Sequence, residues 1–377
     1  MDNKKRMAQF REHMRAEGIG SAFIFNPDLQ FYLTGFRTMI YSRPIVLVID
    51  QEKSSIIIPG LEEVHARESA KIDELFVYYE HPNAPNKKLS YIEYLHDFMD
   101  KMDHKTIGLD LDFAPSAIYL LFNNRGFNVV DVGNFILRMR FIKSENEFAA
   151  LRNSSILVDE GVKYSLAAAA VGVTEMDIDA AGTRALFEKT SILFPNATLD
   201  QFSMTPSGAL RSTMPHVFSN TRKIESGDVI IHSRQVALNG YRSELERTII
   251  VGKADATKRK ALLAATNAQI AALEKIKAGV KASSVDQAAR DVFEKEGFLE
   301  HVVHRTGHAI GIGSHEPPYI RYDNEMLLEE GMVFTVEPGI YIPDVGGFRH
   351  SDTIIVTKNG YEMITSYSNK IEDLIYD

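Results

Sequence analysis

One pair of sequence runs constrains the fold more than any other part of the chain. Residues 229–238 (VIIHSRQVAL) and 241–251 (YRSELERTIIV) are rich in apolar residues, and Asn239-Gly240 lies between them. An Asn-Gly pair between two such runs is the strongest short signal for a β-hairpin, because both positions tolerate the positive φ angles of a tight turn. The chain is therefore predicted to form two antiparallel strands here.

The side chains of these strands alternate between two faces, so each face has its own chemistry. Glu244 and Glu246 point to one side of the second strand, while Leu245 and Arg247 point to the other. Two carboxylates on one face are suited to hold a metal ion or to anchor a cationic group of a substrate. The hairpin thus carries candidate site residues as well as fold information.

The rest of the chain divides by its pattern into an α/β part and a second part that contains the hairpin. Apolar runs predict strands at 21–25, 44–50, 54–59, 106–111 and 128–132, with helices at 4–17, 62–69 and 91–102 between them. The pattern of the sequence changes near residue 145, where a long amphipathic helix is predicted to begin and to run to Ala170. We predict an α/β (α+β) protein with an N-terminal domain over residues 1–143 and a C-terminal domain over residues 144–377.

Composition excludes several classes of protein. The net charge of −9 opposes non-specific binding of nucleic acid, and the absence of cysteine excludes disulfides and zinc–thiolate sites. The N-terminal segment MDNKKRMAQF has no apolar core of a secretory signal, and no run is long enough to span a membrane. We expect a cytoplasmic enzyme that binds neither nucleic acid nor membrane.

Histidines gather in the C-terminal part. Seven of the twelve lie between residues 216 and 350, three of them in HRTGHAIGIGSHEPP (304–318), and Glu337 follows in VEPGIY. Imidazole exchanges protons near neutral pH and is the commonest metal ligand in proteins. This clustering predicts an active site.

Several motifs in order resemble one known family. They are NPDLQFYLTGF (26–36), RFIKSENEFAALRNS (140–154), HRTGHAIGIGSHEPP, GMVFTVEPGIYIP (331–343) and GGFRHSDTIIVTKNGYEMIT (346–365). Together they resemble the creatinase/prolidase/aminopeptidase P superfamily over nearly the whole chain. The resemblance implies a creatinase-like N-terminal α/β domain and a C-terminal catalytic domain with the pita-bread fold.

The peptidases of that superfamily hold two divalent ions, and the resemblance places their ligands on five positions. These positions are Ser233, Glu244, His308, Glu337 and Ser351. Serine is neutral and a poor ligand for hard divalent ions, so two anionic oxygens are missing. We expect no cofactor, with the alternative of one divalent ion (Mn, Zn or Co) held by Glu244, His308 and Glu337.

The metal-independent creatinase branch resembles this chain more closely at its reactive positions. That resemblance implies a catalytic site of His216, Glu246, Glu337 and His308, in which His216 moves the protons. It implies substrate-binding roles for a further set of residues: Tyr41, Arg43, Arg321, His304, His315 and Glu244. Tyr41 and Arg43 are expected to reach the site of the neighbouring subunit in a homodimer, and Arg43 and Arg321 to hold a carboxylate.

The predicted function is hydrolysis of a C–N (amide or amidine) bond in a small carboxylate-bearing substrate, by histidine acid–base catalysis without a dinuclear metal centre. One alternative is an Xaa-Pro dipeptidase or aminopeptidase P-type metallopeptidase, which acts on dipeptide-like substrates. A second alternative is an inactive pita-bread module that only binds a partner.

Overall fold

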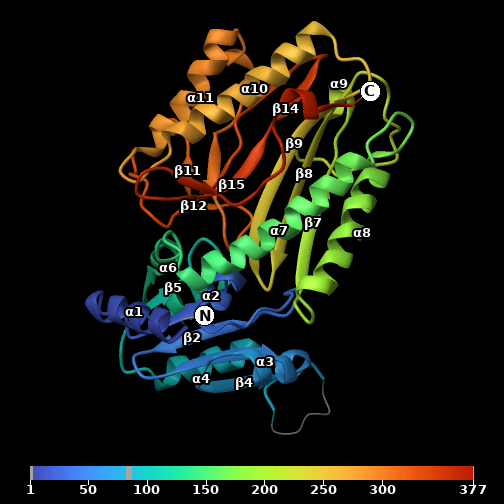
Figure 1. Cartoon of the computed structure of the whole chain (residues 1–377). Coiled ribbons are helices and arrows are strands. Elements are labelled where there is room, and N and C mark those ends of the chain that lie inside the picture. Colours follow the sequence, from blue (N-terminus) through green and yellow to red (C-terminus); the bar gives the residue numbers. More distant parts are fainter. Residues whose placement is uncertain (1–2, 82–86, 377) are drawn as a thin grey trace. The chain divides into compact units, whose positions relative to one another are not determined.

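The computed structural model describes residues 3–81 and 87–376, and the chain folds into two compact units, Met1–Arg140 and Phe141–Asp377 (Figure 1). Each unit has its own sheet and its own apolar core. The predicted α/β (α+β) class is confirmed. Within the described ranges, none of the helices combines the length and the apolar character that crossing a membrane requires.

The N-terminal unit is built on a six-stranded sheet in the order β4-β3-β2-β1-β5-β6. Its strands are β1 (Ser21–Ile24), β2 (Val46–Asp50), β3 (Ser54–Pro59), β4 (Glu74–Tyr78), β5 (Thr106–Leu109) and β6 (Asn128–Asp131). Its α-helices are α1 (Asn3–Ala16), α2 (Pro27–Thr34), α3 (Glu63–Ser69), α4 (Tyr91–Lys101), α5 (Ser116–Asn124) and α6 (Gly133–Met139). The pairs β1–β2 and β2–β3 are antiparallel and the others are parallel, so the sheet is mixed.

Helix α2 was not predicted as a helix, although its start carries a clear signal. The Asn26 side chain accepts hydrogen bonds from the backbone N–H groups of Asp28 and Leu29, and Pro27 occupies the first helical turn. Both are typical of a helix N-terminus. The buried run from Leu29 to Thr34 lacks the polar positions of an amphipathic helix, and its periodicity is therefore weak.

The C-terminal unit contains a nine-stranded sheet with a main path of β11-β10-β12-β15-β9-β8-β7. The strands are β7 (Leu199–Met204), β8 (Asp228–Leu238), β9 (Tyr241–Val251), β10 (Gly307–Ala309), β11 (Glu316–Ile320), β12 (Val333–Val336) and β15 (Ser351–Val356), with β16 (Tyr361–Met363) beside β15 and β17 (Ile375–Tyr376) beside β9. A separate hairpin joins β13 (Gly339–Ile342) to β14 (Gly346–Arg349). This sheet places the candidate site residues on adjacent strands.

The hairpin predicted around Asn239-Gly240 is confirmed. Strands β8 and β9 pair antiparallel over their whole length, and Asn239 and Gly240 have φ angles of 49° and 90°. Both values are positive, as a tight type I′ turn requires. The register pairs Ser233 with Glu246 and Gln235 with Glu244, which fixes these four side chains on one face.

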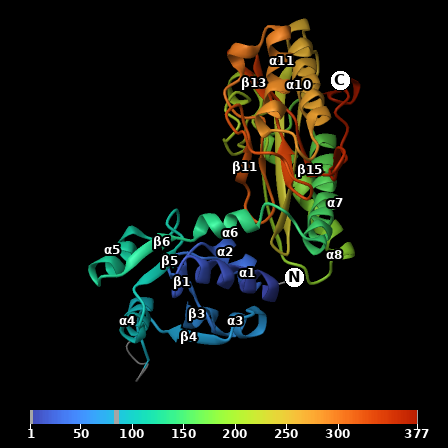
Figure 2. The ribbon, with the colours of Figure 1, turned by 90° about the vertical axis from the view of Figure 1, so that its left-hand side faces the viewer.

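Two helix pairs cover the sheet of the C-terminal unit (Figures 1 and 2). One pair is α7 (Glu145–Ala167) and α8 (Glu175–Leu193), beside β8 and β9; the other is α10 (Ala256–Lys275) and α11 (Ala282–Glu296). Helix α7 begins at a capping box in which Ser144 and Glu147 satisfy each other's backbone N–H groups. The apolar core contains Leu245 and Ile249, so the face that carries Glu244 and Glu246 points away from it.

Candidate active site

The candidate site lies where four neighbouring strands of the large sheet, β10, β12, β15 and β9, present polar side chains. Glu244 and Glu246 belong to β9, His308 to β10 and Ser351 to β15, while Glu337 directly follows β12. All five residues are buried. Because these strands adjoin in the sheet, residues more than a hundred positions apart in the chain become neighbours.

Glu244, His308 and Glu337 form one buried group, here called the triad. Their potential ligand atoms all lie within 4.8 Å of one another. His308 Nε2 is 3.2 Å from Glu337 Oε1 and 3.9 Å from Glu244 Oε2. The other ring nitrogen, Nδ1, lies 2.9 Å from the carbonyl oxygen of Ala309 and donates to it, which leaves the Nε2 lone pair directed at the two carboxylates.

Without a positive charge between them, the triad groups are all driven toward their neutral forms. Burial lowers the pKa of His308 to about 4. Burial and the charge of Glu246 raise the pKa of Glu244 to about 7, and burial and Glu244 raise the pKa of Glu337 well above its usual value. Each shift shows that the charged form lacks a compensating partner in this group.

One divalent cation fits this group. His308 Nε2 is buried and has no hydrogen-bond partner among the described residues, and its lone pair and two carboxylates converge on one point. Two carboxylates and an imidazole are donors that Mn, Zn and Co accept, and the bond from Nδ1 to a carbonyl fixes the ring for ligation. The expectation that no cofactor is needed is therefore not supported: the two serines remove ligands but leave a complete three-residue set.

The two serines at the positions of missing ligands act as hydrogen-bond donors to the glutamates. Ser351 Oγ donates to Glu244 Oε1 at 2.7 Å, and Gln235 donates to the other oxygen of the same carboxylate. Ser233 hydrogen-bonds to Glu246. These contacts orient the carboxylates but add no negative charge, so the group suits one cation better than two.

Glu246 forms a separate buried ion pair with Arg349, the last residue of β14. Arg349 Nε is 2.5 Å from Glu246 Oε2, and Nη2 is 2.6 Å from Oε1, so both carboxylate oxygens are engaged. Burial alone would raise the pKa of Glu246, but the Arg349 guanidinium outweighs it and lowers that pKa. This bidentate pairing was not expected, since the sequence analysis assigned Glu246 to the catalytic residues without a partner at Arg349.

A hydrogen-bonded chain continues from Arg349 to His304. Arg349 Nη1 donates to the hydroxyl oxygen of Tyr341 at 3.1 Å, and that hydroxyl lies 2.9 Å from His304 Nε2. His304 Nδ1 donates to the Arg305 carbonyl at 2.6 Å, so Nε2 is the acceptor. Burial, followed by the charge of Arg349, lowers the pKa of His304 to about 4, which keeps this ring neutral.

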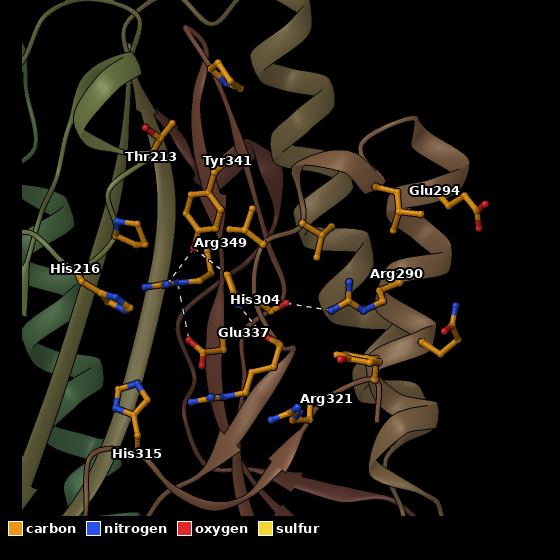
Figure 3. Close-up of a pocket in the computed structure, with 18 of the residues that line it drawn as sticks. Thr213, His216, Arg290, Glu294, His304, His315, Arg321, Glu337, Tyr341 and Arg349 are labelled. Atoms are coloured by element: carbon orange, nitrogen blue, oxygen red, sulfur yellow. Dashed lines mark hydrogen bonds and ion pairs between the residues drawn. The ribbon is translucent and has the colours of Figure 1, made fainter. Parts of the chain in front are cut away.

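A cavity of about 1310 Å³ opens onto these groups. Figure 3 shows His216 and His315 on one side of it, Arg290 and Glu294 of α11 on the other, and Glu337, Arg349, His304 and Tyr341 between them. The rings of His308 and His315 are 4.0 Å apart, so His315 links the triad to the cavity. His216 lines this cavity and is exposed.

The structure brings most of the predicted site residues to this region, and a few lie elsewhere. Arg321 lines the cavity but pairs with Asp323 two residues away. Tyr41 and Arg43 belong to the N-terminal unit, where Tyr41 is exposed and Arg43 pairs with Glu80 at 2.6 Å. Their predicted roles at a neighbouring subunit's site stay predictions, as does the homodimer.

Three site residues were missed at the sequence level: Arg349, Tyr341 and Gln235. Gln235 could have been found by alternation, because it lies two residues after Ser233 and faces the same side. Arg349 and Tyr341 come from the small β13–β14 hairpin, whose pairing brings Gly339 opposite Arg349. The sequence carries no signal that this hairpin folds against Glu246.

Comparison with known proteins agrees with this geometry. Residues 6–142 match the model for the creatinase/prolidase N-terminal domain, and residues 149–358 match that for metallopeptidase family M24. A putative dipeptidase of Bacillus subtilis, YkvY, is 31% identical over 96% of this chain and 98% of its own length, and an Xaa-Pro dipeptidase of Pyrococcus furiosus is 26% identical over 98% and 99%. The crystal structure of a prolidase from Pyrococcus horikoshii superposes with a TM-score of 0.85, at 26% identity over 97% and 99% of the two chains.

Proposed function

We propose, because this chain belongs to metallopeptidase family M24, that it is a hydrolase of the C–N bond in dipeptide-like substrates, with Xaa-Pro dipeptides as the first class to test. The observation that carries the proposal is the triad, in which an unpartnered imidazole nitrogen and two carboxylates converge in a buried position. The names of the similar proteins, a putative dipeptidase and an Xaa-Pro dipeptidase, support the same substrate class. This function was the alternative in the sequence-based prediction.

Glu244, His308 and Glu337 would hold one divalent ion. The chemistry that such an ion supplies is Lewis-acid stabilisation of the negative charge that develops on a carbonyl oxygen during C–N cleavage. The buried setting strengthens this effect, because little water screens the charge. The serine and glutamine donors to Glu244 keep that carboxylate oriented.

The other residues that line the cavity would transfer protons and orient the substrate. His216, which is exposed at the cavity, would deliver a proton to the leaving nitrogen. His315, beside His308, and the neutral His304 offer ring nitrogens toward the same cavity. Arg349, fixed by Glu246 and Tyr341, places a permanent positive charge 3.9 Å from the second oxygen of Glu337.

A second candidate function is metal-independent hydrolysis by histidine acid–base catalysis, as in the creatinase-like reading. The observation that favours it is the replacement of two ligand positions by Ser233 and Ser351, which donate hydrogen bonds instead of holding a cation. Under this reading His216 moves the protons, and Glu246 and Glu337, with Glu244 nearby, would bind a cationic or N–H-rich group of the substrate. The two candidates differ in whether turnover needs a metal ion.

The experiment is a turnover screen of Xaa-Pro dipeptides, creatine and N-acyl amino acids, with protein purified without chelator. Each reaction is repeated after EDTA treatment and dialysis, and again after addition of Mn²⁺, Zn²⁺ or Co²⁺. The proposal expects cleavage of dipeptides, loss of at least about 10²-fold in rate after EDTA, and recovery with one of the ions. Undiminished turnover after EDTA would favour the metal-independent function, and no turnover of any compound would favour a binding module.

A further inference from the structure

The cavity contains four arginines, and three of them are already neutralised. Arg290 pairs with Asp286 at 2.5 Å, Arg321 pairs with Asp323, and Arg349 pairs with Glu246. An arginine whose fork already grips a carboxylate has few donors left for a substrate. Arg305 is the remaining one.

Arg305 is held in place but has no anionic partner among the described residues. Its guanidinium lies over the ring of Tyr319, 4.2 Å from the centroid. Its Nε is buried and makes no hydrogen bond within the described part of the chain. Ring stacking fixes the plane of a guanidinium without using its N–H donors, so the fork stays available in a defined orientation.

Arg305 is also close to the reacting centre. It lines the same cavity as Glu337 and His315. Its positive charge interacts electrostatically with His308, His315 and Glu337. In a dipeptide one residue, about 3.8 Å of chain, separates the cleaved bond from the terminal carboxylate. An anchor for that carboxylate therefore has to lie near the triad, as Arg305 does.

We propose that Arg305, stacked on Tyr319, is the residue that binds the carboxylate of the substrate, in place of Arg321. This inference rests on the proposed function and narrows it. The substrate must carry a free carboxylate one residue beyond the cleaved C–N bond, so the enzyme rejects C-terminal amides. The two N–H groups of the fork match a carboxylate in geometry and charge.

The test compares acids with their amides on four proteins: wild type, Arg305→Met, Arg305→Lys and Arg321→Gln. Calorimetry measures the binding of L-proline, N-acetylglycine and creatine, each beside its amide, and kinetics measures the cleavage of Ala-Pro and its amide. We expect wild type to prefer at least one acid over its amide by about tenfold to a hundredfold, the usual range for hydrogen bonds to a charged group. The preference should vanish in Arg305→Met and persist in Arg321→Gln.

Arg305→Lys is the control for a folding defect, because this variant keeps the positive charge and most of the side chain. It should retain part of the acid preference, since an ammonium group lacks the planar fork. Thermal unfolding of each variant identifies any protein that is not folded.

Each outcome separates this inference from the proposed function. An acid preference that survives in folded Arg305→Met, that is lost in Arg321→Gln, or that is absent from wild type overturns the role of Arg305, even if dipeptides are cleaved. No binding of any acid in the panel overturns it as well. Conversely, the acid preference could depend on Arg305 while no dipeptide is cleaved. That result would support Arg305 as the carboxylate-binding residue and would contradict the proposed function.

Discussion

Buried carboxylates of the site lie in two different settings, and their charges are balanced differently. Glu246 has both oxygens bound to Arg349, and this partner lowers its pKa. Glu244, two residues away on the same strand, shares its surroundings with Glu337 and His308, and its pKa is raised to about 7. Burial is nearly the same for both glutamates, so the difference in pKa comes from the guanidinium bound to Glu246 and from the charge of Glu246, which acts on Glu244.

This comparison indicates what the triad lacks. A buried carboxylate needs a partner of opposite charge, because the cost of leaving water is otherwise uncompensated. The chain supplies that partner to Glu246 as a guanidinium bonded to both oxygens. Near the triad the same guanidinium comes only within 3.9 Å of Glu337 Oε2, and the lone pair of His308 also faces the carboxylates. The site therefore balances its buried carboxylates in two ways. Arg349 neutralises Glu246, and the triad offers a position for an added cation.

The largest expected effect comes from breaking the triad. Glu337→Gln and His308→Ala should each lower kcat/KM by about 10³-fold, which corresponds to the several kcal/mol that a metal ion contributes to a transition state. Glu294→Gln is the matched control, since this glutamate lines the same cavity outside the triad. A fall of the same size in the control would mean that the cavity, and not the triad, carries the effect.

Breaking the Glu246–Arg349 ion pair should lower the free energy of unfolding. Arg349→Met leaves Glu246 buried without its partner and should lower the free energy of unfolding by about 3–5 kcal/mol. The double variant Arg349→Met/Glu246→Gln removes both charges and should recover most of this loss, which chemical denaturation can measure. Equal losses in the single and double variants would show that Glu246 does not depend on Arg349.

Replacing His216 tests its contribution to catalysis, separately from the two carboxylate settings. His216→Ala should lower kcat by about 10²-fold, at the lower end of what a positioned acid or base contributes, and leave KM nearly unchanged. Steady-state kinetics with the substrate identified by the screen measures this. His301→Ala, a histidine outside the cavity lining, should leave both constants unchanged. An unaltered kcat in His216→Ala would remove this residue from the reaction.

The smallest expected effect concerns the orientation of Glu244. Ser351→Ala removes the hydrogen bond to Oε1 and should weaken Mn²⁺ binding by about tenfold, as is usual for a residue that orients a ligand. Calorimetric titration measures the affinity, and Ser191→Ala, at an exposed position of α8, serves as the control. If affinity does not change, Gln235 alone orients this carboxylate.

The hairpin and the placement of Glu244 and Glu246 were predictable because they depend on local rules. The Asn-Gly turn fixes the register of β8 and β9, and strand alternation then assigns each side chain to a face. The convergence of His308 and Glu337 on this face came from the family resemblance. Local rules alone cannot show that β12 pairs with β15 and that β10 pairs with β12.

The partners of the charged groups could not be predicted from the sequence. Glu246 and Arg349 are about a hundred residues apart, and their contact depends on how the β13–β14 hairpin packs. The same limit led to the expectation of no cofactor: the two serines were counted as lost ligands, while the unpartnered nitrogen of His308 becomes evident only in three dimensions. Arg305 was overlooked for a related reason, because only the structure shows that it has no anionic partner among the residues described.

The most direct test of the account is the number of metal ions that the folded protein binds. Elemental analysis and calorimetric titration with Mn²⁺ should find one ion per chain in the wild type and in Glu294→Gln, and none in His308→Ala or Glu337→Gln. A wild-type protein that binds no ion, or that binds two, would contradict the claim that the triad is a site for a single cation.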